Sequence, residues 1–465
     1  MQMAVFVMFL VGLASNGVAG PPDTLWTRRF GGEEDEWGWW VEECHDGGFV
    51  LTGWSNSYPP RNMRGYLVRT NSHGDTLWSR VLSFSTGTVF QTYCVRQTSD
   101  RGYIVLGYTN AYSYDAVLWR FDSSGHELWQ EHYGGSGTEA DYLFEVAETP
   151  DNGFIATGHR YDGSDHNLYL LKTDSAGRVD WERLYGRPEF YERGEAVINT
   201  ADGGYAVVGI QGNGIWLLRL NQDGDTLWTR GFGSGVSSAT SLLQMPDSGF
   251  VFAGYVARGL YSDGYIARTR ANGDTVWTRK VGTYELDEKF CSVASTADGG
   301  FVCGGWHYPN PNDINTWLVR FNSAGDTLWA ASYGNDTTDD YCYSAREVST
   351  DGYILCGRTD WQTAGRFDIW LVRTGPGIGI DETPSAELRA PNRGPTIVNC
   401  VLYLSEAASG ERIAKDACLL DIAGRRVLSL HPGPNDLSRL APSVYFGHSA
   451  IANRHSAMFR VVITK

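Results

Sequence analysis

The tetrapeptide Asp23-Thr24-Leu25-Trp26 recurs along the chain, with small variations, at a nearly constant interval. Successive tryptophans of this phrase are 52, 51, 52, 47, 49 and 52 residues apart. A fixed period of roughly 50 residues is typical of a repeat architecture. Residues 21–374 are therefore one module written seven times. The other copies of the phrase are Asp75–Trp78, His126–Trp129, Arg178–Trp181, Asp225–Trp228, Asp274–Trp277 and Asp326–Trp329.

Each module contains four short segments of high β propensity. Turn-forming residues, such as Ser99-Asp100-Arg101-Gly102 and Asp122-Ser123-Ser124-Gly125, separate the segments. Runs rich in β-branched and aromatic residues, bounded by Asp, Gly and Ser, predict strands joined by tight hairpins. No module has an uninterrupted helical-period stretch of 10 residues, so helix is disfavoured. In the second module the predicted strands are Thr92–Thr98, Tyr103–Gly107, Val117–Phe121 and His126–Tyr133.

Seven four-stranded modules predict an all-β fold, a seven-bladed β-propeller. The last module has a third strand, Ile369–Arg373, but then runs into Gly375-Pro376-Gly377 without an outer strand. A surplus outer strand, Asp23–Arg29, precedes the first module. We therefore expect the N-terminal strand to complete the seventh blade and close the ring, which also removes an exposed sheet edge.

The first 19 residues are expected to be a signal peptide. An apolar run, Ala4–Leu13, is followed by the small residues Gly17 and Ala19, which suit cleavage after Ala19. No other segment approaches the ~18 apolar residues needed to span a bilayer, so no transmembrane segment is predicted. The net charge of −16 argues against nucleic acid or an anionic membrane as a partner. We expect a propeller at 20–374, a linker at 375–387 and a second domain at 388–465.

The second domain is expected to be a small β-sandwich. Its predicted strands are Thr396–Leu404, Ala417–Ile422, Arg426–Leu430, Ser443–Phe446 and Met458–Ile463.

Two stretches resemble known families. Leu420–Val427 and Asn435–Phe446 are similar to the C-terminal sorting domain of the type IX secretion system. That resemblance implies secretion machinery as a partner and a protein that is secreted, or attached to the bacterial outer surface. Separately, Asp122–Trp129 resembles the tryptophan-docking hairpin of pyrroloquinoline-quinone-type propellers, which implies packing and no chemistry.

The eight cysteines would meet an oxidising compartment after export. Cys291 and Cys303 lie on adjacent predicted strands, as do Cys342 and Cys356, but each pair is out of register for a direct bridge. Within the tail, Cys400 and Cys418 are the better pair. No CxxC motif occurs, so a zinc site is not supported.

Features that recur in every module indicate scaffold, whereas features that differ are candidates for function. Every third strand carries a basic residue. A functional basic ring is one interpretation, and a structural charge meeting nearby carboxylates such as Asp75 and Asp225 is the other, which we prefer. The seven positions are Arg69, Arg120, Lys172, Arg219, Arg268, Arg320 and Arg373.

Strand alternation puts the uniform turns, such as Asp46-Gly47-Gly48, on one face of the ring and all the variable loops on the other. Variable loops on a rigid scaffold are where binding usually occurs. These loops are rich in aromatic residues, which offer flat faces, and in Asp and Asn, which offer hydrogen bonds. The loops are Trp54–Gly65, Tyr108–Asp115, His159–Asn167, Tyr255–Gly264, Trp306–Asn315 and Arg358–Asp368. The candidate ligand-binding residues are Trp54, Tyr112, Asp115, Tyr161, Asp162, Asp165, Trp306, Tyr308, Asp313 and Trp361.

Three functions remain open at this stage. The first is a secreted or cell-surface binding or adhesion propeller whose ligand is a glycan or a peptide. The second is a structural or protein-interaction repeat without a small ligand. The third is a polysaccharide-active enzyme, for which His159, His166 and His307 could supply acid–base chemistry. No spacing identifies a catalytic pair, the acidic runs lack EF-hand spacing, and no cofactor or metal is predicted. Two carboxylates in a deep cleft would favour the enzyme, whereas an aromatic platform would favour binding.

Overall fold

The computed structural model describes residues 21–375, except 60–61, 83–89, 111–114, 135–140, 162, 164, 189, 234, 284, 336 and 361–365. Beyond residue 375 it describes the backbone of seven strands. The chain divides into two compact units, Met1–Ile380 and Asp381–Lys465. The described residues form no helix, and so none that could cross a membrane.

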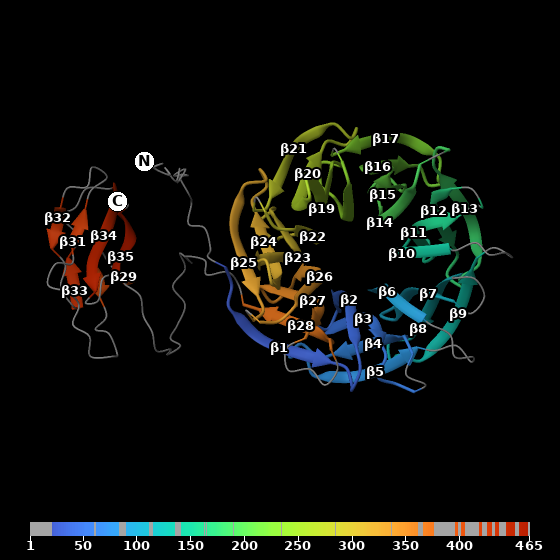
Figure 1. Cartoon of the computed structure of the whole chain (residues 1–465), viewed down its shortest axis with the longest axis horizontal. Coiled ribbons are helices and arrows are strands. Elements are labelled where there is room, and N and C mark those ends of the chain that lie inside the picture. The colour runs from blue at the N-terminus through green and yellow to red at the C-terminus, as the bar shows by residue number, and fades with distance from the viewer. Residues whose placement is uncertain are drawn as a thin grey trace. The chain divides into compact units, whose positions relative to one another are not determined.

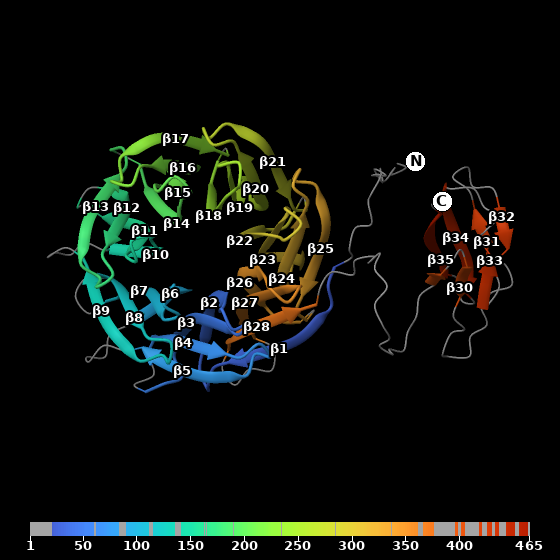
Figure 2. The same cartoon turned by 180° about the vertical axis from the view of Figure 1, so that it is seen from behind.

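The first unit is a seven-bladed β-propeller, and each blade is a four-stranded antiparallel sheet. One strand of every blade lies near the axis and the last lies at the rim (Figure 1, Figure 2). Blades one to three contain β2 (Glu36–Glu43), β3 (Phe49–Ser55), β4 (Arg64–Thr70), β5 (Thr76–Leu82); β6 (Phe90–Gln97), β7 (Tyr103–Thr109), β8 (Asp115–Phe121), β9 (Glu127–Tyr133); β10 (Asp141–Glu148), β11 (Phe154–Tyr161), β12 (His166–Thr173), β13 (Val179–Tyr185). Blades four and five contain β14 (Glu192–Asn199), β15 (Tyr205–Gln211), β16 (Gly214–Leu220), β17 (Thr226–Phe232); β18 (Ser237–Gln244), β19 (Phe250–Arg258), β20 (Tyr261–Thr269), β21 (Thr275–Val281). Blades six and seven contain β22 (Glu288–Ser295), β23 (Phe301–Asn310), β24 (Asp313–Phe321), β25 (Thr327–Tyr333); β26 (Asp340–Glu347), β27 (Tyr353–Thr359), β28 (Asp368–Thr374) and the N-terminal β1 (Thr24–Phe30).

The ring is closed as the sequence predicted. Strand β1 pairs antiparallel with β28, from Thr24 opposite Thr374 to Phe30 opposite Ile369. The seventh blade therefore combines the two ends of the repeat array (Figure 1). A hydroxyl of the neighbouring blade holds the incoming chain, because Tyr333 Oη donates to the carbonyl of Pro22 at 2.9 Å.

The recurring tryptophan joins neighbouring blades at the rim. Trp26 and Trp78 lie against Gly74 and Gly125, glycines in the outer hairpins of the next blades. Both glycines have φ of +77°, which favours a residue without a Cβ. A Cβ there would also lie 2.7–2.9 Å from the indole ring. The hairpin Asp122–Trp129 thus packs against a tryptophan of the neighbouring blade, as its resemblance to a tryptophan-docking hairpin implied. The same contact recurs at Trp129/Gly177, Trp181/Gly224, Trp228/Gly273 and Trp277/Gly325.

Every innermost strand carries one extra residue, a β-bulge, at the same place. In β10 the register jumps from Leu143 to Glu145, which leaves Phe144 without a partner. Opposite the bulge stands Gly158, whose Cβ would clash with the carbonyl oxygen of Tyr142. The second strand of every blade has glycine at this position, because only glycine lets the bulged strand approach so closely. The glycines are Gly53, Gly107, Gly158, Gly209, Gly254, Gly305 and Gly357.

The basic residue of each third strand is structural, but its partner is not the one expected. Arg69 pairs with Asp46 at 2.5 Å and Arg120 with Asp100 at 2.6 Å. These carboxylates belong to the inner hairpin, whereas Asp75 pairs with Arg28 of another blade. In six of the seven blades the cation also donates to a main-chain carbonyl at the end of its own strand, as Lys172 Nζ does to Thr173 at 2.8 Å. The inner and outer hairpins both lie at this end of the third strand, so the sequence alone did not show which of them supplies the carboxylate.

The second unit contains the predicted strands with revised bounds. Two sheets form, in the order β29-β30-β33 and β32-β31-β34-β35. The first predicted strand is split into two, β33 is an additional strand that was not predicted, and residues 447–451 pair with residues 455–459. The strands are β29 (Thr396–Val398), β30 (Val401–Leu404), β31 (Cys418–Leu420), β32 (Arg426–Ser429), β33 (Gly433–Asp436), β34 (Ser443–Ile451) and β35 (His455–Ile463). The sandwich arrangement of these sheets stays a prediction.

The propeller cysteines are free thiols among the described residues, as their predicted lack of register indicated. Cys303 lies opposite Val293, and Cys356 lies opposite Ser344. The side chains of Cys400 and Cys418 lie outside the described part of the chain.

Candidate ligand-binding face

The antiparallel strand order separates two faces of the ring. Uniform hairpins join the first to the second strand and the third to the fourth, so both sets lie on one face. The connections from second to third strand, and from blade to blade, lie on the other, here called the variable face. Several predicted loops on that face are strands instead. In blade five the pairing continues to Arg258 opposite Tyr261, and in blade six to Asn310 opposite Asp313.

Aromatic and cationic side chains gather just inside the variable face. They occupy two positions in a blade. One is the second residue of the innermost strand, and the other is the residue paired with it in the second strand, directly after the glycine that lies opposite the β-bulge. Trp37 stacks on Trp54 with ring centroids 5.3 Å apart, and Trp306 meets Tyr341 of the next blade at 5.6 Å. We call this set the aromatic belt: Trp37, Trp54, Tyr108, Tyr142, His159, Tyr255, Lys289, Trp306, Tyr341 and Arg358.

Two cations lie between the rings of the belt. The Arg358 guanidinium carbon is 3.4 Å from the Trp37 ring centroid and 4.2 Å from that of Tyr341. Lys289 Nζ is 4.2 Å from the Tyr255 centroid and 5.3 Å from that of Trp306. Contacts of this kind are attractive because the ring face carries negative charge density. The belt therefore links blades five, six, seven and one on this side of the mouth.

A second tier lies deeper along the axis. It consists of the bulged residues, of which Trp39 is 4.4 Å from Tyr343 and 5.7 Å from Tyr93 by ring centroid. Tyr93 in turn is 5.6 Å from Phe144. These contacts join the innermost strands of blades seven, one, two and three. In blades four to six the same position holds the smaller or polar Glu195, Thr240 and Cys291, so the lining of the axis is aromatic on one side only.

A charged cluster lies still further from the variable face. Arg96 pairs with Glu42 at 3.0 Å and with Glu145 at 2.5 Å. The guanidinium groups of Arg96 and Arg346 lie 4.5 and 4.9 Å from the ring of Trp40. Burial and the nearby Arg96 lower the pKa of Arg346. These ion pairs and ring contacts join the innermost strands of blades one, two, three and seven.

Two of the three histidines proposed for the enzyme alternative, His159 and His307, are weak bases. Burial, with the charges of His166 and Arg193, lowers the pKa of His159 to about 3. Burial lowers the pKa of His307 to about 4, and its Nε2 is 2.6 Å from Ser332 Oγ. A general base works best with a pKa near the working pH, which these two groups do not have.

The sequence candidates are distributed unevenly. Trp54, Trp306 and Tyr308 lie in strands β3 and β23 rather than in loops, and Trp54 and Trp306 belong to the belt. Asp115 and Asp313 begin β8 and β24, where they are 8% and 2% exposed. They are thus part of the scaffold between blades. Tyr161 and Asp165 are half-buried in the hairpin of blade three. Tyr112, Asp162 and Trp361 lie outside the described residues.

The predicted variable loops begin at the second-strand members of the belt, but the members in the innermost strands were missed because only loops were searched. Trp37, Tyr142 and Tyr341 lie in innermost strands, and each directly follows the buried acidic residue that begins its strand. A signal for their partners was present, since the residue after the recurring second-strand glycine is Trp54, Tyr108, His159, Ile210, Tyr255, Trp306 or Arg358. That position varies from blade to blade, whereas the glycine does not.

An open groove of about 850 Å³ adjoins the belt at blades five and six. The groove is lined by the extended hairpins of blades five and six and by the connection between these two blades. Tyr308 links the groove to the belt, since its ring centroid is 6.0 Å from that of Trp306. Asp287 does not offer a free carboxylate, because it accepts hydrogen bonds from the amide and hydroxyl of Ser262. The lining residues are Tyr261, Thr283, Glu285, Leu286, Asp287, Tyr308, Pro309, Asn310 and Pro311.

No protein-family model matches the sequence, and a search of curated proteins finds no similar sequence. Solved structures with a similar fold exist at low identity. Sqt1 from Chaetomium thermophilum is 11% identical, with 77% of this chain and 89% of that chain covered and a TM-score of 0.47. The quinohemoprotein alcohol dehydrogenase ADHIIG from Pseudomonas putida HK5 is 11% identical, with coverages of 82% and 79% and a TM-score of 0.44. The β-propeller domain of the Trilobed protease from Pyrococcus furiosus is 8% identical, with coverages of 72% and 93% and a TM-score of 0.43. These likenesses carry no argument about function.

Proposed function

We propose that this protein is a binding propeller that takes an extended glycan or peptide across its variable face. The observation that carries the proposal is the aromatic belt, in which rings of adjacent blades meet around the mouth of the axis. The ring centroids of Tyr108 and Tyr142 are 4.9 Å apart, and those of Trp306 and Tyr341 are 5.6 Å apart. The half-buried rings can each contribute stacking free energy beyond the area that they bury, and they are Trp37, Tyr142, Tyr255, Trp306 and Tyr341. Trp54 and Tyr108 are only 6% and 9% exposed and serve as their buried support. The groove at blades five and six would guide the ligand toward Trp306 and Lys289.

The chemistry of the belt suits binding better than bond cleavage. Its polar members are cations held between rings, which attract acceptor oxygens and carboxylates of a ligand. The neighbouring histidines are weak bases, and Asp287 is held by Ser262. Sugar rings and aromatic or aliphatic peptide side chains both present flat apolar faces to such rings.

The test is a glycan array and a peptide array probed with the purified full chain, followed by affinity measurements on the best partner. Replacing both Trp306 and Tyr341 by alanine removes two ring contacts of ~0.5–1.5 kcal/mol each. We therefore expect affinity to fall about tenfold or more. The matched control is Leu227→Ala, because Leu227 is 57% exposed on a rim strand. Equal losses in both variants, or binding that depends only on the uniform hairpins, would refute the assignment of the face.

We also propose that the chain is exported, with residues 388–465 as the address and the secretion machinery as its partner. The support is the resemblance of Leu420–Val427 and Asn435–Phe446 to a sorting domain, together with the apolar run Ala4–Leu13. Mass spectrometry of native material should find a chain that begins near Gly20 outside the cell. A cytoplasmic protein that retains Met1 would contradict both parts of the proposal.

A further inference from the structure

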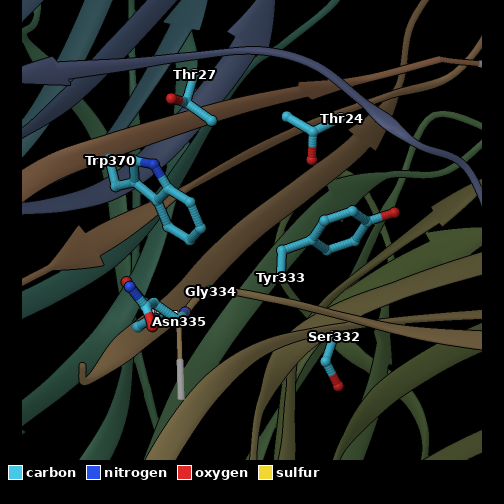
Figure 3. A pocket seen from close by; sticks show the side chains of 8 residues that line it. Thr24, Thr27, Ser332, Tyr333, Gly334, Asn335 and Trp370 are labelled. Carbon is cyan, nitrogen blue, oxygen red and sulfur yellow. Dashed lines mark hydrogen bonds between the residues drawn. The ribbon is translucent and has the colours of Figure 1, made fainter. Parts of the chain in front are cut away.

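A second pocket lies away from the axis, where the closing strand meets blade six. It has a volume of about 510 Å³, within the range of roughly 300–1,000 Å³ typical of small-molecule sites. Figure 3 shows the indole of Trp370, the hydroxyl side chains of Thr24, Thr27 and Ser332, and the ring of Tyr333 around a common space. We call it the junction pocket, and its lining residues are Thr24, Thr27, Ser332, Tyr333, Gly334, Asn335, Asp340 and Trp370.

The junction pocket depends on ring closure. Thr24 and Thr27 belong to β1, whereas Ser332 and Tyr333 end β25 of blade six. Strand β1 is held beside β28 by pairing of Thr27 with Val372 and of Arg29 with Trp370. The two walls of the pocket thus come from segments about 300 residues apart in the chain. A chain with an open seventh blade would lack one wall.

Two buried polar atoms in residues of the pocket have no hydrogen-bond partner among the described residues. Asp340 is 1% exposed. Its Oδ2 accepts from Thr338 Oγ1 at 2.7 Å and from the Asn335 amide at 3.1 Å, and Oδ1 has no partner. Burial raises the pKa of this carboxyl, and the Thr359 side chain opposes that rise. Trp370 is 7% exposed, and its indole Nε1 is unpaired. Leaving a buried donor or acceptor unpaired costs about 1–3 kcal/mol each. A ligand that satisfies both would recover that free energy.

The two unpaired groups define the chemistry of the ligand. Asp340 needs a donor, and the Trp370 N–H needs an acceptor. A metal ion would satisfy the carboxylate but leave the indole unpaired, and an anion would be repelled by Asp340. A sugar hydroxyl is both donor and acceptor, and the carbon face of a sugar ring packs on indole and phenol rings. Neither atom is exposed to solvent, so contact with a ligand requires side-chain rotation of the kind that often accompanies binding.

We propose that the junction pocket binds one neutral sugar ring, with a hydroxyl donating to Asp340 and another accepting from Trp370. Thr24, Thr27 and Ser332 supply further hydroxyl partners at the rim. This site is separate from the aromatic belt and needs no ligand at the mouth of the axis. The ring could belong to a free monosaccharide or to the end of a longer glycan, and the two sources have the same contact chemistry.

The experiment uses the full chain with glucose, galactose, mannose and N-acetylglucosamine, and with oligosaccharides that end in each. Saturation-transfer NMR finds the binder, and titration calorimetry gives its affinity. Trp370→Phe keeps a ring but removes the N–H, so we expect binding to weaken about tenfold, corresponding to one lost hydrogen bond. Trp216→Phe is the matched control, because Trp216 occupies the same third-strand register in blade four and does not line the pocket. It should cost similar stability and leave sugar binding unchanged.

Asp340→Asn gives a second measurement with little change in size. It should weaken sugar binding as well, while the Trp306/Tyr341 double variant should leave it intact. Free sugars that bind as tightly as oligosaccharides indicate a monosaccharide site, and tighter oligosaccharides indicate a chain end. No binding by any sugar, an equal loss in Trp216→Phe, or loss on mutation of the belt would each overturn the proposal. Binding of an amine or a metal ion instead would do so too.

Discussion

At the residue scale, one glycine per blade shapes both the fold and the candidate site. The glycine of the second strand has no Cβ, so the bulged innermost strand can approach it closely. The bulge then turns Trp39, Tyr93 and Phe144 toward one another around the axis. The residue after the glycine enters the belt. A position that looks like a weak point in a strand is therefore what allows the aromatic lining to form.

Replacing Gly158 by alanine should destabilise the propeller by about 1–3 kcal/mol, the usual range for overpacking. The new Cβ would overlap the carbonyl oxygen of Tyr142. Urea unfolding measures the change. Gly214→Ala is the control, since a Cβ there meets nothing closer than 3.6 Å. Similar midpoints for the two variants would show that the bulge does not depend on glycine.

A buried acid at the closing blade gives a pH dependence. Burial, reinforced by the neighbouring Glu36 and Asp35 and opposed by Arg29, raises the pKa of Asp368 to about 6. The unfolded value is about 3.9, so between about pH 4 and pH 6 the native state binds more protons than the unfolded state. Stability then falls as pH rises through that window and stays lower above it.

We expect Asp368→Asn to remove this part of the pH dependence. Thermal midpoints of the variant should decline less than those of the wild-type protein as pH rises from about 4 to about 7. The difference between the two curves isolates Asp368 from other titrating groups. Parallel curves would mean that the pKa of Asp368 is not raised.

At the scale of elements, the closing strand β1 has two structural roles. Strand β1 supplies the outer strand of blade seven and one wall of the junction pocket. Its role as outer strand follows from the missing strand at the end of the array. Its role in the pocket arises because β1 lies where Trp370 of β28 and Tyr333 of β25 face the same space.

Deleting residues 1–30 should leave β28 as an unpaired edge. Hydrogen exchange in Asp368–Thr374 should become fast, because its outward amides lose their partners in β1. The thermal midpoint should fall as well. Peptides from β16 of blade four serve as the internal control and should keep their protection. Unchanged exchange in β28 would contradict closure by β1.

At the scale of the whole molecule, the axis changes character from one face to the other. The belt near the variable face is followed by the bulge tier and then by the charged cluster of Arg96, Arg346, Glu42 and Glu145. Both inner tiers are concentrated on blades seven, one, two and three. Blades four to six have smaller or polar side chains in the bulge tier, and blades five and six adjoin the open groove. A seven-fold scaffold thus presents a one-sided surface, as a specific binding site requires.

The propeller should also be stable without its tail. The chain divides near Ile380, and every described blade is completed by strands within Thr24–Thr374. A chain that ends at residue 380 should keep the thermal midpoint of the propeller and its ligand binding, and calorimetry checks the first point. A large loss of stability would show that residues 381–465 contribute to the propeller.

The sequence by itself determined the architecture of the propeller: seven blades, four strands in each, and closure by Asp23–Arg29. It could do so because a repeat displays its scaffold seven times, and because a missing strand at one end matched a surplus strand at the other. It also separated the uniform face from the variable one, since antiparallel strands alternate in direction. The bulge was not predicted, because one extra residue per strand leaves the alternation of segments unchanged.

Only the tertiary structure decided which side chains meet. Trp37 and Trp306 come from different blades and gather at the mouth because a ring brings residues far apart in sequence to one axis. Asp115 and Asp313 appeared available in loops but lie buried between strands. The junction pocket could not be predicted either, since its walls join the first strand to the sixth blade. Spacing along a chain fixes local pairing, whereas a site built across blades depends on the angles at which the sheets pack.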